Sequence, residues 1–235
     1  MPPQRLKRLD EARWRWAAID AIAFLGWTAA VAVGLLDRLD RAATAVVRPD
    51  DEWLWPQVLC NHFVDRLEPG HAVWVPAVVA LVACVVRRSV RPAVLAAGTG
   101  AVTAAAVVAV KTWVAQPDGQ GNLYNGGSYP SGHTVALVVC SGLTVLLVTA
   151  RPPRRAWLVP AGLGVVMASC LVVIGAHWLS DVVGGVLLGM LVLAVLHASG
   201  LARWAAGPQG TPSPLARGRS RGRSRGRSRG RSRGW

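Results

Sequence analysis

Two histidines and one aspartate carry the clearest indication of chemistry in this sequence. His177 and Asp181 are four residues apart, so on a helix they share one face, and the carboxylate can hydrogen-bond the imidazole. An imidazole held in this way is a candidate nucleophile, because the carboxylate fixes its tautomer and leaves the second ring nitrogen available for attack. His133 offers a second imidazole, which can give a proton to a departing oxygen.

The stretch YPSGHT, residues 129–134, indicates which group is transferred. Pro130 restricts the start of a helix, Ser131 can cap it, and Gly132 lets backbone N–H groups come close to a ligand. A helix N-terminus has unpaired donors and the positive end of the helix dipole, so it is a ready anion site. Lys111 would add a point charge. Together with the two imidazoles, this pattern predicts phosphoryl transfer.

Other interpretations of these residues explain less. Lys111 taken alone fits a side chain that reaches toward lipid headgroups, and Ser131 lacks the G-x-S-x-G motif of a serine hydrolase. A transporter would show interrupted helices with charges near the bilayer midplane. His177 and Asp181 would need a third ligand to hold a metal, and the sequence offers no obvious one. We therefore predict neither a metal site nor a cofactor.

Long apolar segments must position these groups. The chain of 235 residues is 52% apolar and only 16% charged, with a mean hydropathy of +0.36, which is typical of a membrane protein. Crossing about 30 Å of hydrocarbon takes about 20 helical residues. Continuous apolar runs favour helices over a barrel. We predict an all-α bundle of six transmembrane helices, at approximately 16–36, 71–86, 92–113, 132–150, 157–176 and 178–199. The second run is short and is expected to extend at both ends.

Basic residues predict the orientation of this bundle. The six helices leave all but five of the 26 Lys and Arg residues on one side; the five are Arg38, Arg41, Arg48, Arg66 and Lys111. Because Lys and Arg accumulate in cytoplasmic loops, we predict a plasma-membrane protein with both termini in the cytoplasm. The segments that contain Lys111, His133 and His177 would then meet on the extracytoplasmic face.

The chain outside the bundle falls into two basic segments. Residues 1–15 form a basic cytoplasmic N-terminus, 16–199 the transmembrane domain, and 200–235 a cytoplasmic tail. From Arg217 to Arg233 the tail alternates Arg with Gly and Ser, and this part has no apolar residues with which to build a core, so we expect disorder. Anionic lipid headgroups are its predicted partner; nucleic acid is the weaker alternative. The sequence predicts no oligomeric state.

A further helix is predicted in the first outer loop. Apolar residues recur there at four-residue intervals, which puts them on one helical face: Trp55, Leu59, Phe63 and Leu67. The segment is too polar to span the bilayer, so we predict an interfacial helix over about 53–68.

Two motifs resemble those of a known family. "PSGH", followed some forty residues later by "GAHWLSDVVGG", is similar to the second and third signatures of the type 2 phosphatidic acid phosphatase (PAP2) family, whose members share a helical core with vanadium haloperoxidases. The resemblance covers roughly Lys111 to Gly185, and the six-helix layout extends it. It implies metal-independent chemistry at an extracytoplasmic site. The roles that it implies are these: His177 forms a phosphohistidine, Asp181 orients it, His133 protonates the leaving group, and Lys111, Ser131 and Gly132 bind phosphate.

Two positions depart from the family pattern. Asp118 in "KTWVAQPDG" stands where the first signature has Arg, and Leu171 stands where the third has Arg, six residues before its His. An Arg contact to phosphate is a strong charge-assisted bond, and loss of such a contact typically costs on the order of a hundredfold or more in rate. Candidate replacements on the outer side are three arginines and two asparagines: Arg41, Arg48, Arg66, Asn122 and Asn125.

The sequence thus predicts an integral membrane phosphatase that hydrolyses a lipid phosphate or diphosphate monoester through a phosphohistidine intermediate. The alternative is a catalytically weak or inactive relative that binds a phosphorylated lipid or a partner protein, and the absent arginines motivate it. A haloperoxidase is disfavoured, because vanadate would need the cationic site even more. The sequence does not predict which lipid is the substrate.

Overall fold

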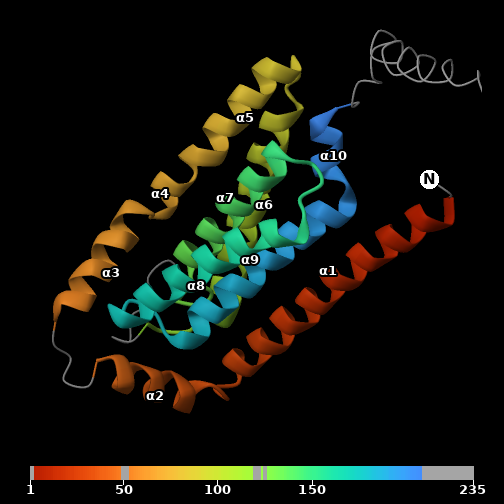
Figure 1. Cartoon of the computed structure of the whole chain (residues 1–235). Helices are drawn as coiled ribbons and strands as arrows, with labels where there is room; N and C mark the ends of the chain where they lie inside the picture. Colours follow the sequence, from red (N-terminus) through yellow and green to blue (C-terminus); the bar gives the residue numbers. More distant parts are fainter. Residues whose placement is uncertain (1–2, 49–52, 119–122, 124–125, 208–235) are drawn as a thin grey trace, which may run out of the picture.

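The structure is a computed structural model that describes residues 3–48, 53–118, 123 and 126–207, with the backbone alone for 3–10 (Figure 1). Every regular element in these ranges is a helix, which confirms the all-α prediction. The helices are α1 (Pro3–Ala32), α2 (Asp37–Val47), α3 (Trp55–Arg66), α4 (Pro69–Ala72), α5 (Trp74–Arg87), α6 (Arg91–Val114), α7 (Gly132–Val148), the 3₁₀ turn η2 (Arg154–Trp157), α8 (Leu158–Val173), α9 (Leu179–Ser199) and α10 (Leu201–Ala206). The predicted disordered tail, 200–235, begins with the helix α10, whose Ala202 and Ala205 pack in the core, so disorder was wrong for these residues; the part from residue 208 onward lies outside the described residues.

The membrane-spanning helices follow the predicted apolar runs. Four helical segments are long and apolar enough to cross a bilayer: Pro69–Arg87, Arg91–Val114, Arg154–Val173 and Leu179–Ser199. The first of these segments consists of α4 followed by α5, and α4 supplies the extra length that the second predicted run needed to cross the bilayer. The fourth predicted run forms α7, an apolar helix of 17 residues. The chain is therefore a multi-pass membrane protein.

The first predicted run ends earlier than expected. α1 stops at Ala32, and Gly34 then adopts a left-handed conformation with φ of +70°. The segment Glu11–Ala32 and α2 meet at a bend of 89°, and they satisfy the length and hydropathy requirement for a span only together. α1 runs along α9, while α2 turns across the ends of α8 and α9 (Figure 1). α2 was not predicted, and it matters for the site below.

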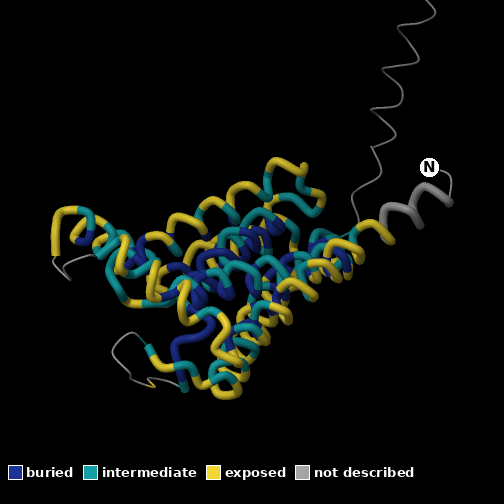
Figure 2. Tube along the Cα trace, turned by 90° about the horizontal axis from the view of Figure 1, so that it is seen from below, coloured by how far each residue is buried: buried dark blue, intermediate teal, exposed yellow. Residues whose placement is uncertain are grey.

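α7 is the centre of the bundle. It packs against α5, α8 and α9, and nine of its 17 residues are buried. Glycines allow this close packing, as is common between membrane helices: a Cβ on Gly142 would collide with the Leu193 side chain, and a Cβ on Gly189 would lie 2.7 Å from Val138 Cγ1. In Figure 2 the buried residues run through the middle of the bundle and the exposed ones face outward. Many outward side chains are apolar, such as Ile22 and Val86, as expected of a surface in contact with lipid.

The segment between α2 and α4 contains the predicted helix, observed as α3. Its contact with α8 uses Phe63 and Val64, which pack on an apolar cluster around Met167. Trp55 and Leu59, from the predicted apolar stripe, are 76% and 61% exposed. In Figure 1, α3, α4 and α5 follow one another along one edge of the molecule. An interfacial position of α3 stays a prediction.

Candidate active site

Asp181 lies at the centre of the site, fully buried in the first turn of α9. Its Oδ2 accepts hydrogen bonds from the backbone N of Trp178 and from His177 Nδ1, both at 3.1 Å. The first bond closes the start of α9, since an acidic side chain at the third helical position often reaches back to the N-cap amide. The same carboxylate therefore begins the helix and holds the imidazole, so the predicted pairing of His177 with Asp181 is present.

The tautomer of His177 follows from this contact. An ionised carboxylate only accepts hydrogen bonds, so Nδ1 of His177 carries the proton that it donates to Asp181. Nε2 then keeps its lone pair. The His177 side chain is 14% exposed, so it lies at the edge of the protein core rather than inside it. This arrangement suits a nucleophile that must meet a ligand from outside.

Ser128 is a part of the site that the sequence did not reveal. Its Oγ lies 3.2 Å from Asp181 Oδ1, and also within 3.2 Å of the carbonyl oxygens of Gln116 and Pro117. Its backbone N donates to Gln116 O at 2.8 Å. These contacts tie the loop before α7 to the segment after α6, and they hold both against the buried carboxylate.

Lys111 lies near the end of α6 and faces the same loop. Its Nζ donates to the carbonyl oxygens of Gly127 at 2.7 Å and Ser128 at 3.1 Å. The ammonium also interacts electrostatically with Asp181. Lys111 is thus beside the site, as predicted, but two of the three donors of its ammonium group serve backbone carbonyls of the loop.

The N-terminus of α7 meets that of α9. Ser131 is the N-cap residue of α7, and its backbone N donates to Asp181 O at 3.0 Å. The Ser131 hydroxyl makes no capping hydrogen bond, in contrast to what we expected; it accepts instead from Thr134 Oγ1 at 3.3 Å. Ser131 is fully buried.

The first turn of α7 is open beside Gly132. The first intrahelical bond of α7 runs from Val135 N to Ser131 O, so the amides of residues 132–134 belong to the open first turn, where a helix has no acceptors of its own. A Cβ on Gly132 would meet no atom within 4 Å. His133, which is partly buried in this turn, interacts electrostatically with His177 and Lys111. The predicted site residues are therefore brought together from α6, α7 and α9.

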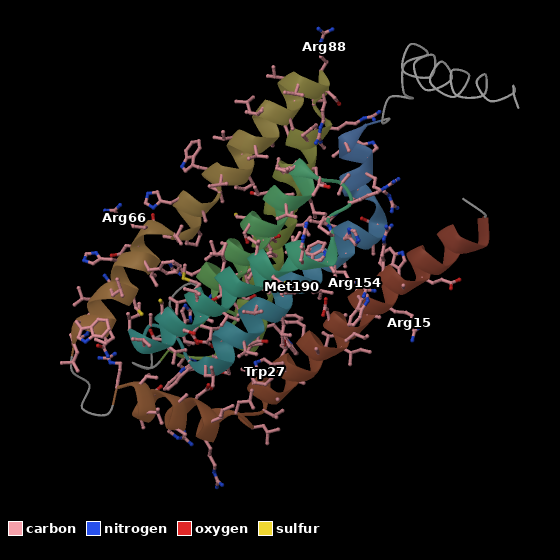
Figure 3. All side chains as sticks on the ribbon, in the orientation of Figure 1. Arg15, Trp27, Arg66, Arg88, Arg154 and Met190 are labelled. Atoms are coloured by element: carbon pink, nitrogen blue, oxygen red, sulfur yellow. The ribbon has the colours of Figure 1, made fainter. Side chains whose placement is uncertain are left out.

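Asp40 of α2 is a second polar group that the sequence did not reveal. It is 3% exposed, and its two carboxylate oxygens accept from Ser180, from the backbone N at 2.7 Å and from Oγ at 2.6 Å. Trp27, which Figure 3 shows between α1 and α9, donates from Nε1 to Ser180 O at 3.0 Å. α1 and α2 are thus both anchored at the residue that precedes Asp181.

Tyr129 fixes the loop from the other side. It is fully buried, its hydroxyl is 2.7 Å from Thr28 Oγ1 of α1, and its ring lies where a Cβ on Gly184 would be. Burial raises the pKa of Tyr129 to about 12, so the phenol stays protonated. It acts as a structural contact between α1, α9 and the loop that carries Ser128.

The two positions at which the family has arginine are occupied differently. Leu171 is buried in the apolar core near Met167. Asp118 lines a cavity of about 210 Å³ beside Trp178 and Arg41. Asn122 and Asn125 lie outside the described residues. Of the predicted replacements, Arg66 projects from the outer edge of α3, away from the bundle (Figure 3), whereas Arg48 Nη1 donates to Ile174 O at 3.0 Å.

Among the residues that the structure describes, no group of three His, Cys, Asp or Glu side chains could hold a metal ion.

Comparison with known proteins agrees with this geometry. A family model of the PAP2 superfamily matches residues 73–205, a range that includes Lys111, His133, His177 and Asp181. An undecaprenyl-diphosphatase from Sulfolobus acidocaldarius is 42% identical over 62 residues. That match covers 26% of this chain and 28% of the relative. No solved structure matches. Because the family model covers more than half of the chain, this protein belongs to the PAP2 superfamily.

Proposed function

We propose that this protein is an integral membrane phosphatase that hydrolyses a lipid phosphate or diphosphate monoester at the extracytoplasmic face through a phosphohistidine intermediate. The observation that carries the proposal is the buried Asp181 carboxylate, which holds His177 beside the open first turn of α7. Membership of the PAP2 superfamily supports the same reaction class.

The first half of the reaction transfers the phosphoryl group to the protein. Nε2 of His177 attacks phosphorus, and the bond between phosphorus and the lipid oxygen breaks. His133 gives a proton to that oxygen, which leaves as a lipid alcohol or, from a diphosphate, as a lipid monophosphate. Asp181 stabilises the positive charge that His177 gains.

The second half regenerates the imidazole. Water attacks the phosphohistidine, His133 takes a proton from the water, and inorganic phosphate leaves while Nε2 of His177 recovers its lone pair. The negative charge of the transferred group lies near the amides of residues 132–134 and near the Lys111 ammonium. Donors fixed in this way stabilise developing charge without reorganising.

An apolar groove supports a lipid as the substrate. It has a volume of about 690 Å³ and lies between α2, α8 and α9. Val172, Val173 and Leu179, which flank the segment that contains His177, line one part of it. A hydrocarbon chain in this groove would place its phosphate near the imidazole. Since the similar protein is named an undecaprenyl-diphosphatase, an isoprenyl diphosphate is the first substrate to test.

The location follows from the distribution of charge. We propose a plasma membrane protein with both termini in the cytoplasm, because Lys and Arg gather on that side of the predicted bundle. The Arg-rich tail would bind anionic headgroups there. The absence of the two family arginines motivates an alternative, a protein that binds a phosphorylated lipid without hydrolysing it. One experiment with matched variants separates the two.

The test measures phosphate release by the full-length protein in detergent. An isoprenyl diphosphate and a lipid monophosphate are offered to the wild type, to His177→Ala and to the control His62→Ala, whose side chain is exposed on α3. We expect release by the wild type and the control, and none above background by His177→Ala. Equal release by all three would eliminate the phosphohistidine reaction. Binding of the lipid without release by the wild type would support the noncatalytic alternative.

A further inference from the structure

Arg48 reaches the loop of the nucleophile from a distant part of the chain. It is the C-cap residue of α2, and its Nη1 donates to Ile174 O at 3.0 Å. Ile174 is the C-cap residue of α8. The last carbonyls of a helix have no intrahelical donor and carry the negative end of the dipole, so a guanidinium is stabilised there. The contact joins residues 126 positions apart.

Gly175 permits this approach. Its φ is +72°, and a Cβ at this position would coincide with the Arg48 guanidinium. Only glycine lets the group lie directly on the backbone here. Gly175 is two residues before His177, so the guanidinium lies against the short segment that carries the nucleophile.

The position of Arg48 is fixed from its own side as well. Val47 packs on the apolar cluster between α3 and α8, and Asp40 anchors α2 at Ser180 through two short hydrogen bonds. Arg48 is partly buried, whereas Arg38 and Arg41 of the same helix are exposed. The folded chain therefore holds the Arg48 guanidinium against the loop of His177, while Arg41 lines the cavity beside Trp178.

A cation at this place would offset the negative charges of the phosphate and of Asp181. A phosphate monoester carries about −1.5 to −2 charges near neutral pH, and the buried Asp181 carboxylate repels it. Lys111 is the nearby ammonium, but it donates to Gly127 O and Ser128 O. Leu171 offers no charge. An arginine fork matches the geometry of phosphate oxygens, and its charge is permanent.

We propose that Arg48 is a phosphate-binding residue of this site: its guanidinium contacts the phosphoryl group on its way to His177. This inference rests on the proposed function. Leu171, near the end of α8, has no charge, and Arg48 of α2 supplies the cation in its place. α2 becomes part of the active site, and the bend after α1 brings it there.

The test compares variants that remove the charge, keep it, or remove it elsewhere on the same helix. Arg48→Gln and Arg48→Lys are measured beside Arg38→Gln for kcat, KM, inhibition by orthovanadate and thermal unfolding in detergent. Arg48→Gln should lower kcat/KM by about a hundredfold and weaken inhibition by vanadate in parallel. Arg48→Lys should lower kcat/KM less than Arg48→Gln does, because lysine keeps the charge but lacks the paired N–H donors of the guanidinium. Arg38→Gln should match the wild type.

Vanadate separates phosphate binding from a purely structural role. If Arg48 only stabilised the end of α8, Arg48→Gln would lower the unfolding temperature, while the affinity of the folded fraction for vanadate would stay the same. That result would overturn the inference. If Arg48→Gln does not fold, Arg48→Lys decides: a value of kcat/KM equal to that of the wild type would overturn the inference, and a loss with weaker vanadate inhibition would support it.

The same experiment distinguishes the two proposals. Full activity of Arg48→Gln alongside an inactive His177→Ala would overturn the role of Arg48 and leave the phosphatase intact. If the wild type itself released no phosphate, the proposed reaction would fail. Vanadate binding measured by calorimetry would then test Arg48 alone, with equal affinity of the wild type and Arg48→Gln counting against it.

Discussion

Asp181→Asn tests whether the charge of the buried carboxylate acts through His177. The change keeps the shape of the side chain. An amide oxygen in the place of Oδ2 can accept from Trp178 N and His177 Nδ1, as the carboxylate does. The amide nitrogen then takes the place of Oδ1 and donates to Ser128 Oγ, which can accept. All three contacts survive, so the fold and the tautomer of His177 should survive with them.

The expected loss follows from the charge alone. Hydrogen bonds to a charged partner contribute about 1.5–3 kcal/mol, and neutral ones about 0.5–1.5 kcal/mol. The bond to His177 gains its full strength when the imidazole becomes positive on phosphorylation. Replacing the charged acceptor by a neutral one should therefore raise the barrier by about 1–2 kcal/mol. That corresponds to a kcat about fivefold to thirtyfold lower.

The assay measures kcat for phosphate release together with the unfolding temperature of the same preparation. Asp181→Ala is the contrast, because it leaves the Trp178 N–H and His177 Nδ1 without their acceptor, whereas Ser128 Oγ keeps Gln116 O and Pro117 O. An orphaned donor costs about 1–3 kcal/mol of stability. We expect Asp181→Asn to fold normally and turn over slowly, and Asp181→Ala to be destabilised. Wild-type kcat in Asp181→Asn would refute the reasoning, since the charge would then have no part in catalysis.

Two further predictions concern the packing that holds the site. Asp40→Ala removes both acceptors of Ser180, whose N–H and hydroxyl are buried, so the free energy of unfolding should fall by about 2 kcal/mol or more. Asp37→Ala, on the exposed side of α2, is the control. Equal unfolding temperatures of the two variants would argue against the anchoring of α2 at Ser180. Gly184→Ala places a methyl group in the ring of Tyr129, which should cost about 1–3 kcal/mol and lower activity by moving the loop before α7. Gly162→Ala, where a Cβ meets no atom within 4 Å, should leave both stability and activity unchanged; a Gly184→Ala variant as stable as this control would contradict the packing described.

Local spacing predicted one part of the site from the sequence. His177 and Asp181 are four residues apart, and a contact at this separation needs only the start of one helix. The apolar runs likewise predicted the spanning helices, because the length that crosses a bilayer is set by hydrocarbon thickness. Both inferences depend on short stretches of chain. The contact of His177 with Asp181 is present, but His177 precedes α9, so the two residues do not share a helical face as predicted.

The sequence pattern did not predict contacts between residues that are far apart in the chain. Asp40 was not predicted to belong to the site, although Asp37 and Asp40 in a first turn are typical of a helix start. Its burial depends on Ser180, 140 residues away. The contact of Ser128 with Asp181 is of the same kind. No periodicity encodes which distant helix start will cover a polar side chain.

Packing also overruled two local expectations. The Ser131 hydroxyl sits at the predicted cap position, but its partner is Thr134 Oγ1 in the first turn of α7 rather than a backbone N–H. In α3, the four-residue stripe correctly indicated a helix, and its Phe63 and Leu67 pack on the cluster around Met167, but Trp55 and Leu59 stay exposed.

The most direct test of the account is to trap the phosphorylated protein. The wild type and His177→Ala are mixed briefly with a substrate labelled in its terminal phosphate, quenched in alkali, in which phosphohistidine survives, and digested. We predict label on the peptide that contains His177 in the wild type, lost in acid, and none in His177→Ala. Label on another residue, or turnover by His177→Ala at the wild-type rate, would contradict the claim that Asp181 holds His177 as the nucleophile.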